Sequence, residues 1–109
     1  MVTRENREVL DRLYRVIDER RTSPKENSYT TRLLAGGVDA IGEKVLEEAG
    51  ELVEAARLKE TGEVVHEAAD LVYHVWVLLA HAGVTLEDVR RELAKREGVS
   101  GLDEKAGRK

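Results

Sequence analysis

The stretch that decides the fold is residues 43–82, in which EKVLEEAGELVEAARL (43–58) and EVVHEAADLVYHVWVLLAHA (63–82) flank a short polar break. On a helix that turns about 100° per residue, the apolar side chains of the first segment gather on one arc. The second segment is apolar around most of its circumference, which is typical of a buried helix. The short connection therefore predicts an antiparallel helical hairpin with the acidic clusters of its two helices at the same level.

Four carboxylates are expected to meet inside this hairpin: Glu48, Glu51, Glu67 and Asp70. Glu51 falls on the polar side of the first helix, and Glu48 falls at the seam between its polar and apolar faces. Like charges at close range resist joint ionisation unless a cation compensates them. Because the ligands would be carboxylate oxygens and the chain has no cysteine, we expect Mg²⁺ or Mn²⁺ rather than zinc.

The competing interpretation is that the acidic residues are solvated faces of amphipathic helices. We prefer that interpretation for Glu43, Glu47 and Glu54 taken alone, but not for the set of four. The string HEAAD (66–70) lacks the second histidine of the HExxH zinc-protease motif.

A di-iron site is a minor alternative. Glu63 and His66 form a Glu-x-x-His step, but such bundles need a second copy on another helix. The first segment, residues 43–58, contains no histidine.

Composition bounds the fold and the partners. A chain of 109 residues with one proline and 41% hydrophobic residues predicts one all-α domain over residues 1–109, an antiparallel bundle of four to five helices. We expect a helical body over about 5–97 and a loose tail over about 98–109. The net charge of −4 and four aromatic residues argue against nucleic acid as a partner. No membrane span or signal peptide is expected, so the predicted location is the cytoplasm.

Helix boundaries follow from caps and breakers. Pro24 ends the first helix, Ser28 is a good N-cap for a short second helix, and Thr85 is a good N-cap for the last one. The expected helices cover residues 5–21, 29–35 (ended by Gly36 and Gly37), 38–58, 63–82 (ended by Gly83) and about 86–96.

Basic residues gather around the loop that follows the first helix: Arg20, Arg21, Lys25 and Arg32. The loop is either a solvated connection or a segment that reaches over a phosphorylated ligand. The sequence favours neither interpretation.

The order of several strings resembles a known family. The spacing EExxE (47–51) followed by ExxD (67–70) is similar to the motif of the all-α nucleoside triphosphate pyrophosphohydrolases, the MazG-like superfamily. Further strings resemble the phosphoribosyl-ATP pyrophosphohydrolase family of histidine biosynthesis: Ser28-Tyr29-Thr30 with Leu33-Leu34, Lys44-Val45, Ala69-Asp70-Leu71-Val72-Tyr73-His74, and Gly83-Val84-Thr85-Leu86-Glu87-Asp88-Val89.

The resemblance implies a MazG-like fold and hydrolysis of phosphoribosyl-ATP to phosphoribosyl-AMP and pyrophosphate, the second step of histidine biosynthesis. It also implies site residues: Glu48, Glu51, Glu67 and Asp70 as metal ligands, Glu47 as a supporting carboxylate, Lys44 as the main phosphate contact, and Ser28, Tyr29 and Arg32 as weaker substrate contacts. For Lys44 the alternative is an ion pair with Glu48.

The resemblance further implies a homodimer or higher homo-oligomer. The apolar residues Val75, Trp76 and Leu79 would need cover on the side away from the third helix. No segment like the cyclohydrolase that many relatives carry is present, so we expect a single activity. Two rivals stay open: a housekeeping MazG-type nucleoside triphosphate pyrophosphohydrolase, and a non-catalytic helical interaction module.

Overall fold

The computed structural model describes residues 3–98 of the chain, and all of its regular structure over these residues is α-helical. The elements are α1 (Arg4–Arg7), α2 (Val9–Thr22), α3 (Tyr29–Arg57), α4 (Thr61–Ala82) and α5 (Leu86–Arg96). The all-α prediction is confirmed, while the expected tail lies almost wholly outside the described residues. No single helix in this part of the chain is long and apolar enough to cross a membrane; α4 and α5 pass that test only as a pair across a 106° bend.

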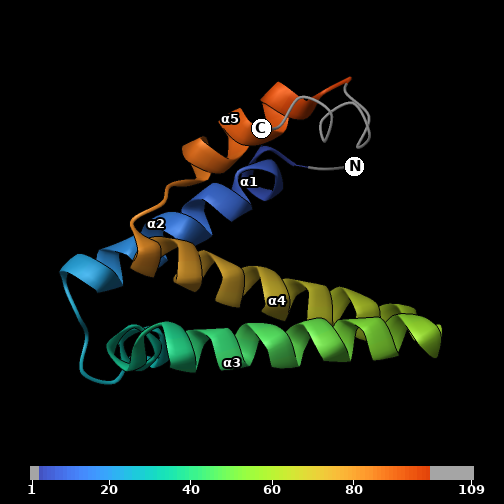
Figure 1. The fold of residues 1–109 in the computed structure, drawn as a ribbon, viewed down its shortest axis with the longest axis horizontal. Helices are drawn as coiled ribbons and strands as arrows, with labels where there is room; N and C mark the ends of the chain where they lie inside the picture. Colours follow the sequence, from blue (N-terminus) through green and yellow to red (C-terminus); the bar gives the residue numbers. More distant parts are fainter. Residues whose placement is uncertain (1–2, 99–109) are drawn as a thin grey trace, which may run out of the picture.

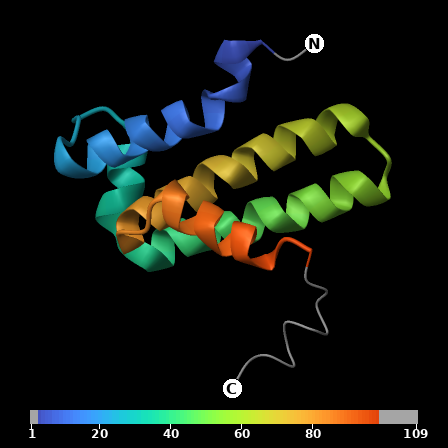
Figure 2. The ribbon, with the colours of Figure 1, turned by 90° about the horizontal axis from the view of Figure 1, so that it is seen from above.

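Helices α3 and α4 form the predicted antiparallel hairpin and lie side by side in both views (Figures 1 and 2). The tight turn between them places Lys59 at φ 56°. Helix α2 packs against α4 and against the first part of α3, so it covers one end of the hairpin (Figure 1). The other end, which carries the turn, projects beyond α2.

The core lies where these three helices meet. Ile17 of α2, Ile41 of α3 and Val77 of α4 are completely or almost completely buried there, with Leu33 and Ala80 beside them. Apolar burial of this kind is the main source of folding free energy. The helices are thus fixed to one another at the end of the hairpin that α2 covers.

The predicted break at Gly36 and Gly37 is a kink inside α3. Gly37 has φ 74° and ψ −167°, which are not helical angles. A positive φ is easily reached only by glycine, so this residue lets the segment from Tyr29 to Gly36 turn away from the rest of α3. The kink brings Tyr29 against α4, as the contacts below show.

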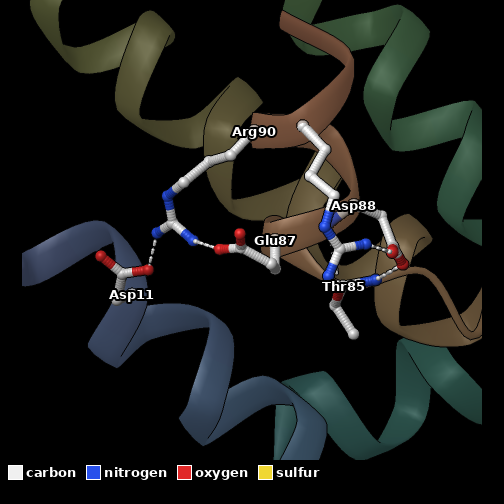
Figure 3. A network of polar contacts seen from close by, with 6 residues as sticks. Asp11, Thr85, Glu87, Asp88 and Arg90 are labelled. Atoms are coloured by element: carbon white, nitrogen blue, oxygen red, sulfur yellow. Dashed lines mark hydrogen bonds and ion pairs between the residues drawn. The ribbon is translucent and has the colours of Figure 1, made fainter. Parts of the chain in front are cut away.

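Both predicted N-caps are confirmed. The Ser28 side chain accepts a hydrogen bond from the backbone N–H of Thr31 at 3.1 Å. At α5, the Thr85 hydroxyl accepts from the Asp88 N–H, and the Asp88 carboxylate accepts from the Thr85 N–H (Figure 3). The expected first helix, residues 5–21, is instead divided by a turn at Glu8 into α1 and α2.

Helix α5 is attached to α2 by polar contacts. Arg90 of α5 forms an ion pair with Asp11 of α2 and also contacts Glu87 (Figure 3). Just before α5, the Tyr14 hydroxyl donates to the Val84 carbonyl at 2.6 Å. These contacts fix the end of the chain's described part to the same end of the hairpin that holds the core.

Candidate active site

Three glutamates from the two hairpin helices meet in the half that α2 does not cover. Glu48 and Glu67 are each only 8% exposed, whereas Glu51 is exposed. One carboxylate oxygen from each of the three lies within 4.8 Å of the other two. The expectation that the acidic clusters of the two helices come level is therefore confirmed for Glu48, Glu51 and Glu67.

This glutamate cluster (Glu48, Glu51 and Glu67) has no lysine or arginine as a partner. Among residues 3 and 6–98, none of these side chains forms an ion pair with any of the three, and the basic group that Glu67 meets is the imidazole of His66, at 3.9 Å. The Oε2 atoms of Glu48 and Glu67 are buried and have no hydrogen-bond partner. An unsatisfied buried acceptor costs about 1–3 kcal/mol, and more when it is charged. The arrangement is therefore unfavourable to folding unless something neutralises it.

A proton is one way to neutralise it. Hydrogen-bonding contact with the Glu51 carboxylate, burial, and the neighbouring Glu48 together raise the pKa of Glu67 to about 8. A carboxyl group with such a pKa keeps its proton at pH 7, because joint ionisation of several close carboxylates is resisted. At pH 7 the cluster therefore holds one extra proton, which belongs to the interacting carboxyl groups as a set.

A divalent cation is the other way. The donor set consists of carboxylate oxygens, two of them buried and unpaired, and hard oxygen donors are the ligands that Mg²⁺ and Mn²⁺ prefer. The residues present therefore fit the metal that the sequence predicts. A bound cation would replace the extra proton of the cluster, because ligands bind metal in their deprotonated form.

Asp70 does not join the three-glutamate cluster. Its side chain is 40% exposed, and its carboxylate lies 3.3 Å from Nε2 of His66, one turn earlier on α4. His66, Glu67 and Asp70 form a second group of potential ligands, so Glu67 is common to both groups. The sequence analysis considered His66 only as part of a zinc-protease or di-iron motif, although its i,i+4 spacing from Asp70 is a signal for this pairing.

Glu47 and Lys44 pair with each other on the exposed side of α3. Their charged atoms are 3.5 Å apart, so the alternative pairing of Lys44 with Glu48 is not what the structure contains. Glu47 and then Tyr29 raise the pKa of the Lys44 ammonium. Lys44 is one turn from Glu48, so a cation stands close to the cluster without neutralising it.

The remaining predicted substrate residues lie at the start of α3. Ser28 is occupied as the N-cap, Arg32 is exposed, and the hydroxyl of Tyr29 lies 3.0 Å from Nε2 of His74. Burial raises the pKa of the Tyr29 phenol, and the charges of Lys44 and Glu48 also act on it.

Cavities open both beside the glutamate cluster and beside the start of α3. One, of about 270 Å³, opens beside the glutamate cluster and is lined by Glu51, Glu54, Ala55, Leu58, Glu60, Glu63 and Glu67. The sequence did not single out Glu60, whose signal was its place in the turn between the two acidic helices. A second, of about 480 Å³, is lined by Arg20, Lys25, Glu26, Asn27 and Ser28. Of the four basic residues around the loop between α2 and α3, Arg20 and Lys25 therefore line this cavity together. Arg21 and Arg32 do not line it.

Comparison with known proteins points to one family. A sequence profile described as phosphoribosyl-ATP pyrophosphohydrolase matches residues 10–97. A protein named phosphoribosyl-ATP pyrophosphatase from Rhodopirellula baltica is 51% identical, over 91% of this chain and 85% of its own length. One of the same name from Methylococcus capsulatus is 48% identical, over 94% of this chain and 97% of its own length.

Some relatives are longer. A protein named histidine biosynthesis bifunctional protein HisIE from Helicobacter hepaticus is 50% identical, over 93% of this chain but only 44% of its own length. The present chain therefore spans less than half of that bifunctional relative.

Proposed function

Because the chain belongs to the phosphoribosyl-ATP pyrophosphohydrolase family of hydrolases, we propose that it hydrolyses phosphoribosyl-ATP to phosphoribosyl-AMP and pyrophosphate in histidine biosynthesis, and that it needs a divalent metal to do so. The observation that carries the metal requirement is the glutamate cluster, with its two buried, unpaired carboxylate oxygens. A non-catalytic interaction module would have no use for a site that costs folding free energy.

Each of the chain's own groups has a proposed part. Glu48, Glu51 and Glu67 would hold Mg²⁺ or Mn²⁺, with Asp70, one turn along α4, as the fourth predicted ligand. Such a cation neutralises charge on phosphate oxygens and on a leaving pyrophosphate when it is bound.

The remaining groups would act on the substrate and on water. Lys44, one helical turn before Glu48 on α3, would contact a phosphate oxygen. Its present partner Glu47 would orient the water that attacks the bond between the α- and β-phosphates. Ser28 and Arg32 are retained as substrate contacts at the start of α3.

Pyrophosphate release from phosphoribosyl-ATP, compared with release from ATP and a panel of deoxynucleoside triphosphates, tests the substrate. We expect phosphoribosyl-ATP to be hydrolysed far faster than the others, and only when Mg²⁺ or Mn²⁺ is present. Comparable turnover of a deoxynucleotide would instead support the housekeeping alternative. Turnover in the presence of a chelator would contradict the metal requirement.

We also propose a homodimer or higher homo-oligomer, for a different reason from the sequence-based one. Helix α2 covers the side of α4 that carries Trp76, whose indole N–H donates to the Leu10 carbonyl at 3.0 Å. Large apolar side chains are instead exposed on the uncovered half of the hairpin, with Leu46 at 77%, Val65 at 66% and Val53 at 51%.

Such an exposed apolar band suits contact with a second copy. Sedimentation of the parent and of Leu46→Asp tests this, and a fully active parent monomer at micromolar concentration would refute it.

A further inference from the structure

Tyr29 differs from the chain's other aromatic residues. Of the four, all within residues 3–98, it is the most exposed, at 41%, whereas the other three are partly buried. It is also the first residue of α3, immediately after the cap at Ser28. An exposed aromatic ring is available for contact with a ligand. Whether it suits that role depends on how firmly the neighbouring residues hold it.

The Tyr29 ring is fixed on two sides. It stacks on Tyr73 with ring centroids 6.1 Å apart and an angle of 18° between the planes. It also meets the imidazole of His74 edge to face, at 5.9 Å. The adjacent residue Thr30 is hydrogen-bonded to the Tyr73 hydroxyl, which ties the same turn of α3 to α4.

The direction of the hydrogen bonds around His74 follows from chemistry. Its Nδ1 lies 2.8 Å from the backbone carbonyl of Asp70, and a carbonyl can only accept, so Nδ1 carries the proton. In the neutral imidazole, Nε2 is then an acceptor, and the Tyr29 hydroxyl donates to it over 3.0 Å. His74 is only 6% exposed, so it cannot itself contact a ligand in solution.

This pair lies about two helical turns along α4 from Glu67, because Tyr29 contacts His74 and His74 follows Glu67 by seven residues. Burial raises the pKa of the Tyr29 phenol, while the nearby Lys44 ammonium opposes that shift and the Glu48 carboxylate adds to it. The phenol and the Lys44 ammonium, the proposed phosphate contact, are therefore within electrostatic range of each other. In a nucleotide, a ribose separates the base from the phosphates, so a subsite for the base has to lie next to the phosphate site rather than within it.

We propose that Tyr29 is the stacking platform for the purine base of the substrate, and that His74 is a positioning residue that holds the Tyr29 ring in place. The proposal rests on the function proposed above. Stacking of a base on an aromatic side chain changes affinity by about tenfold or more, and a ring that is already held loses little freedom when the ligand binds.

The two proposed products test the platform, because phosphoribosyl-AMP contains the purine and pyrophosphate does not. In calorimetric titrations with Mg²⁺ present, Tyr29→Leu should bind phosphoribosyl-AMP about tenfold more weakly than the parent and bind pyrophosphate equally well. The KM for phosphoribosyl-ATP should rise by about the same factor, with kcat little changed. Tyr29→Phe keeps the ring and should lose less than Tyr29→Leu.

The positioning role of His74 is tested by a double-mutant cycle. His74→Leu should raise KM in the parent but have no further effect on KM in Tyr29→Leu, because the ring it positions is gone. His74→Gln, which can still accept from Tyr29 and donate to the Asp70 carbonyl, should restore most of the loss. Tyr14→Phe is the matched control: it removes another phenolic hydroxyl bond, so it should lower the melting temperature without changing KM.

The outcomes separate the two proposals. A parent that does not hydrolyse phosphoribosyl-ATP would refute the proposed function, and with it this inference. If the parent is active, a Tyr29→Leu variant that keeps its affinity for phosphoribosyl-AMP, or that loses affinity for both products equally, would refute the platform alone. A change of subunit number in Tyr29→Leu would assign the ring to a subunit contact instead and would also overturn the proposal.

Discussion

The two halves of the α3–α4 hairpin are built on opposite principles. In the half that α2 covers, Ile17, Ile41 and Val77 are buried with nothing polar to satisfy. In the other half, Glu48 and Glu67 are buried with an unpaired carboxylate oxygen each, and Leu46, Val53 and Val65 are exposed. The first half supplies stability, whereas the second contains a carboxylate cluster that lowers it unless a proton or a cation neutralises the charge. Folding and the candidate chemistry are thus separated along one pair of helices.

The largest expected effect is on activity, from changes in the carboxylate half. Glu48→Gln should lower kcat for pyrophosphate release by about 10²–10³-fold, the cost typical of losing one charge-stabilising group in an active site, while the circular dichroism spectrum stays helical.

The variant Asp70→Asn tests whether Asp70 belongs to the metal site. A loss as large as that of Glu48→Gln would make Asp70 a ligand, as the sequence predicts. A loss of less than about tenfold, the smallest typical of outer-shell partners, would leave it only as the partner of His66.

The next effect is on stability, from a change in the covered half. Ile41→Ala should lower the free energy of unfolding by about 2–5 kcal/mol, because it leaves a cavity in packed surroundings. Leu46→Ala on the other half, where the side chain is exposed, should change it by less than about 0.5 kcal/mol in dilute, dissociated chains. Denaturant titration measures both, and equal losses would mean that the two halves are not different in kind.

Binding of a metal ion to the carboxylate half should raise the free energy of unfolding. At a hundredfold excess of Mg²⁺ over its dissociation constant, the parent should gain about 2.7 kcal/mol of stability by mass action. Glu67→Gln should gain much less, yet without metal it should be at least as stable as the parent, since the amide is neutral at every pH and adds no repulsion to the cluster. Thermal melts with and without Mg²⁺ measure this. A metal-independent loss of stability in the variant would refute the metal site.

The stability of the metal-free protein should depend on pH because of the same carboxylate cluster. The pKa of Glu67 is raised from its ordinary value of 4.5 to about 8 in the folded protein, so between these values the folded state holds a proton that the unfolded chain has released. The stability that this proton contributes is complete below pH about 4.5 and is lost as pH rises through about 8. The metal-free parent should therefore become less stable over this range, and Glu67→Gln should show a flatter profile in melts across pH.

The smallest effect is expected at α5. The ion pair of Arg90 with Asp11 joins side chains that are 50% and 42% exposed, and such surface pairs contribute about 0–1 kcal/mol. Asp11→Asn should lower stability by no more than that and leave activity unchanged. A large loss of activity would mean that the attachment of α5 also supports the carboxylate half, and that the two halves are coupled.

Helical periodicity and caps were enough to predict most of the fold. Ser28 and Thr85 bind their own helix's backbone, and Gly83 closes α4 with φ 75°. These are local interactions, so they can be inferred from neighbouring residues. The turn at Glu8 was missed because no strong helix breaker stands there.

The side chains that meet across helices were predicted less well. Equal distances from a tight turn placed Glu51 level with Glu67, and the structure confirms it. The pairing of Lys44 with Glu47 rather than Glu48 was not foreseen, because a flexible side chain can reach both i+3 and i+4. Tyr29 against His74 depends on the kink at Gly37, whose direction no local pattern specifies.

The sequence by itself thus determined the all-α fold, the hairpin, the alignment of the glutamates of its two helices, and the family. These features depend on short-range geometry and on the order of motifs. Only the tertiary structure decided which carboxylates are buried without partners, which half α2 covers and which aromatic ring stays exposed. Burial is a property of everything packed around a side chain, and that includes helices distant in sequence. The same glutamate spacing would be harmless on a solvated face, and packing alone makes it a candidate site.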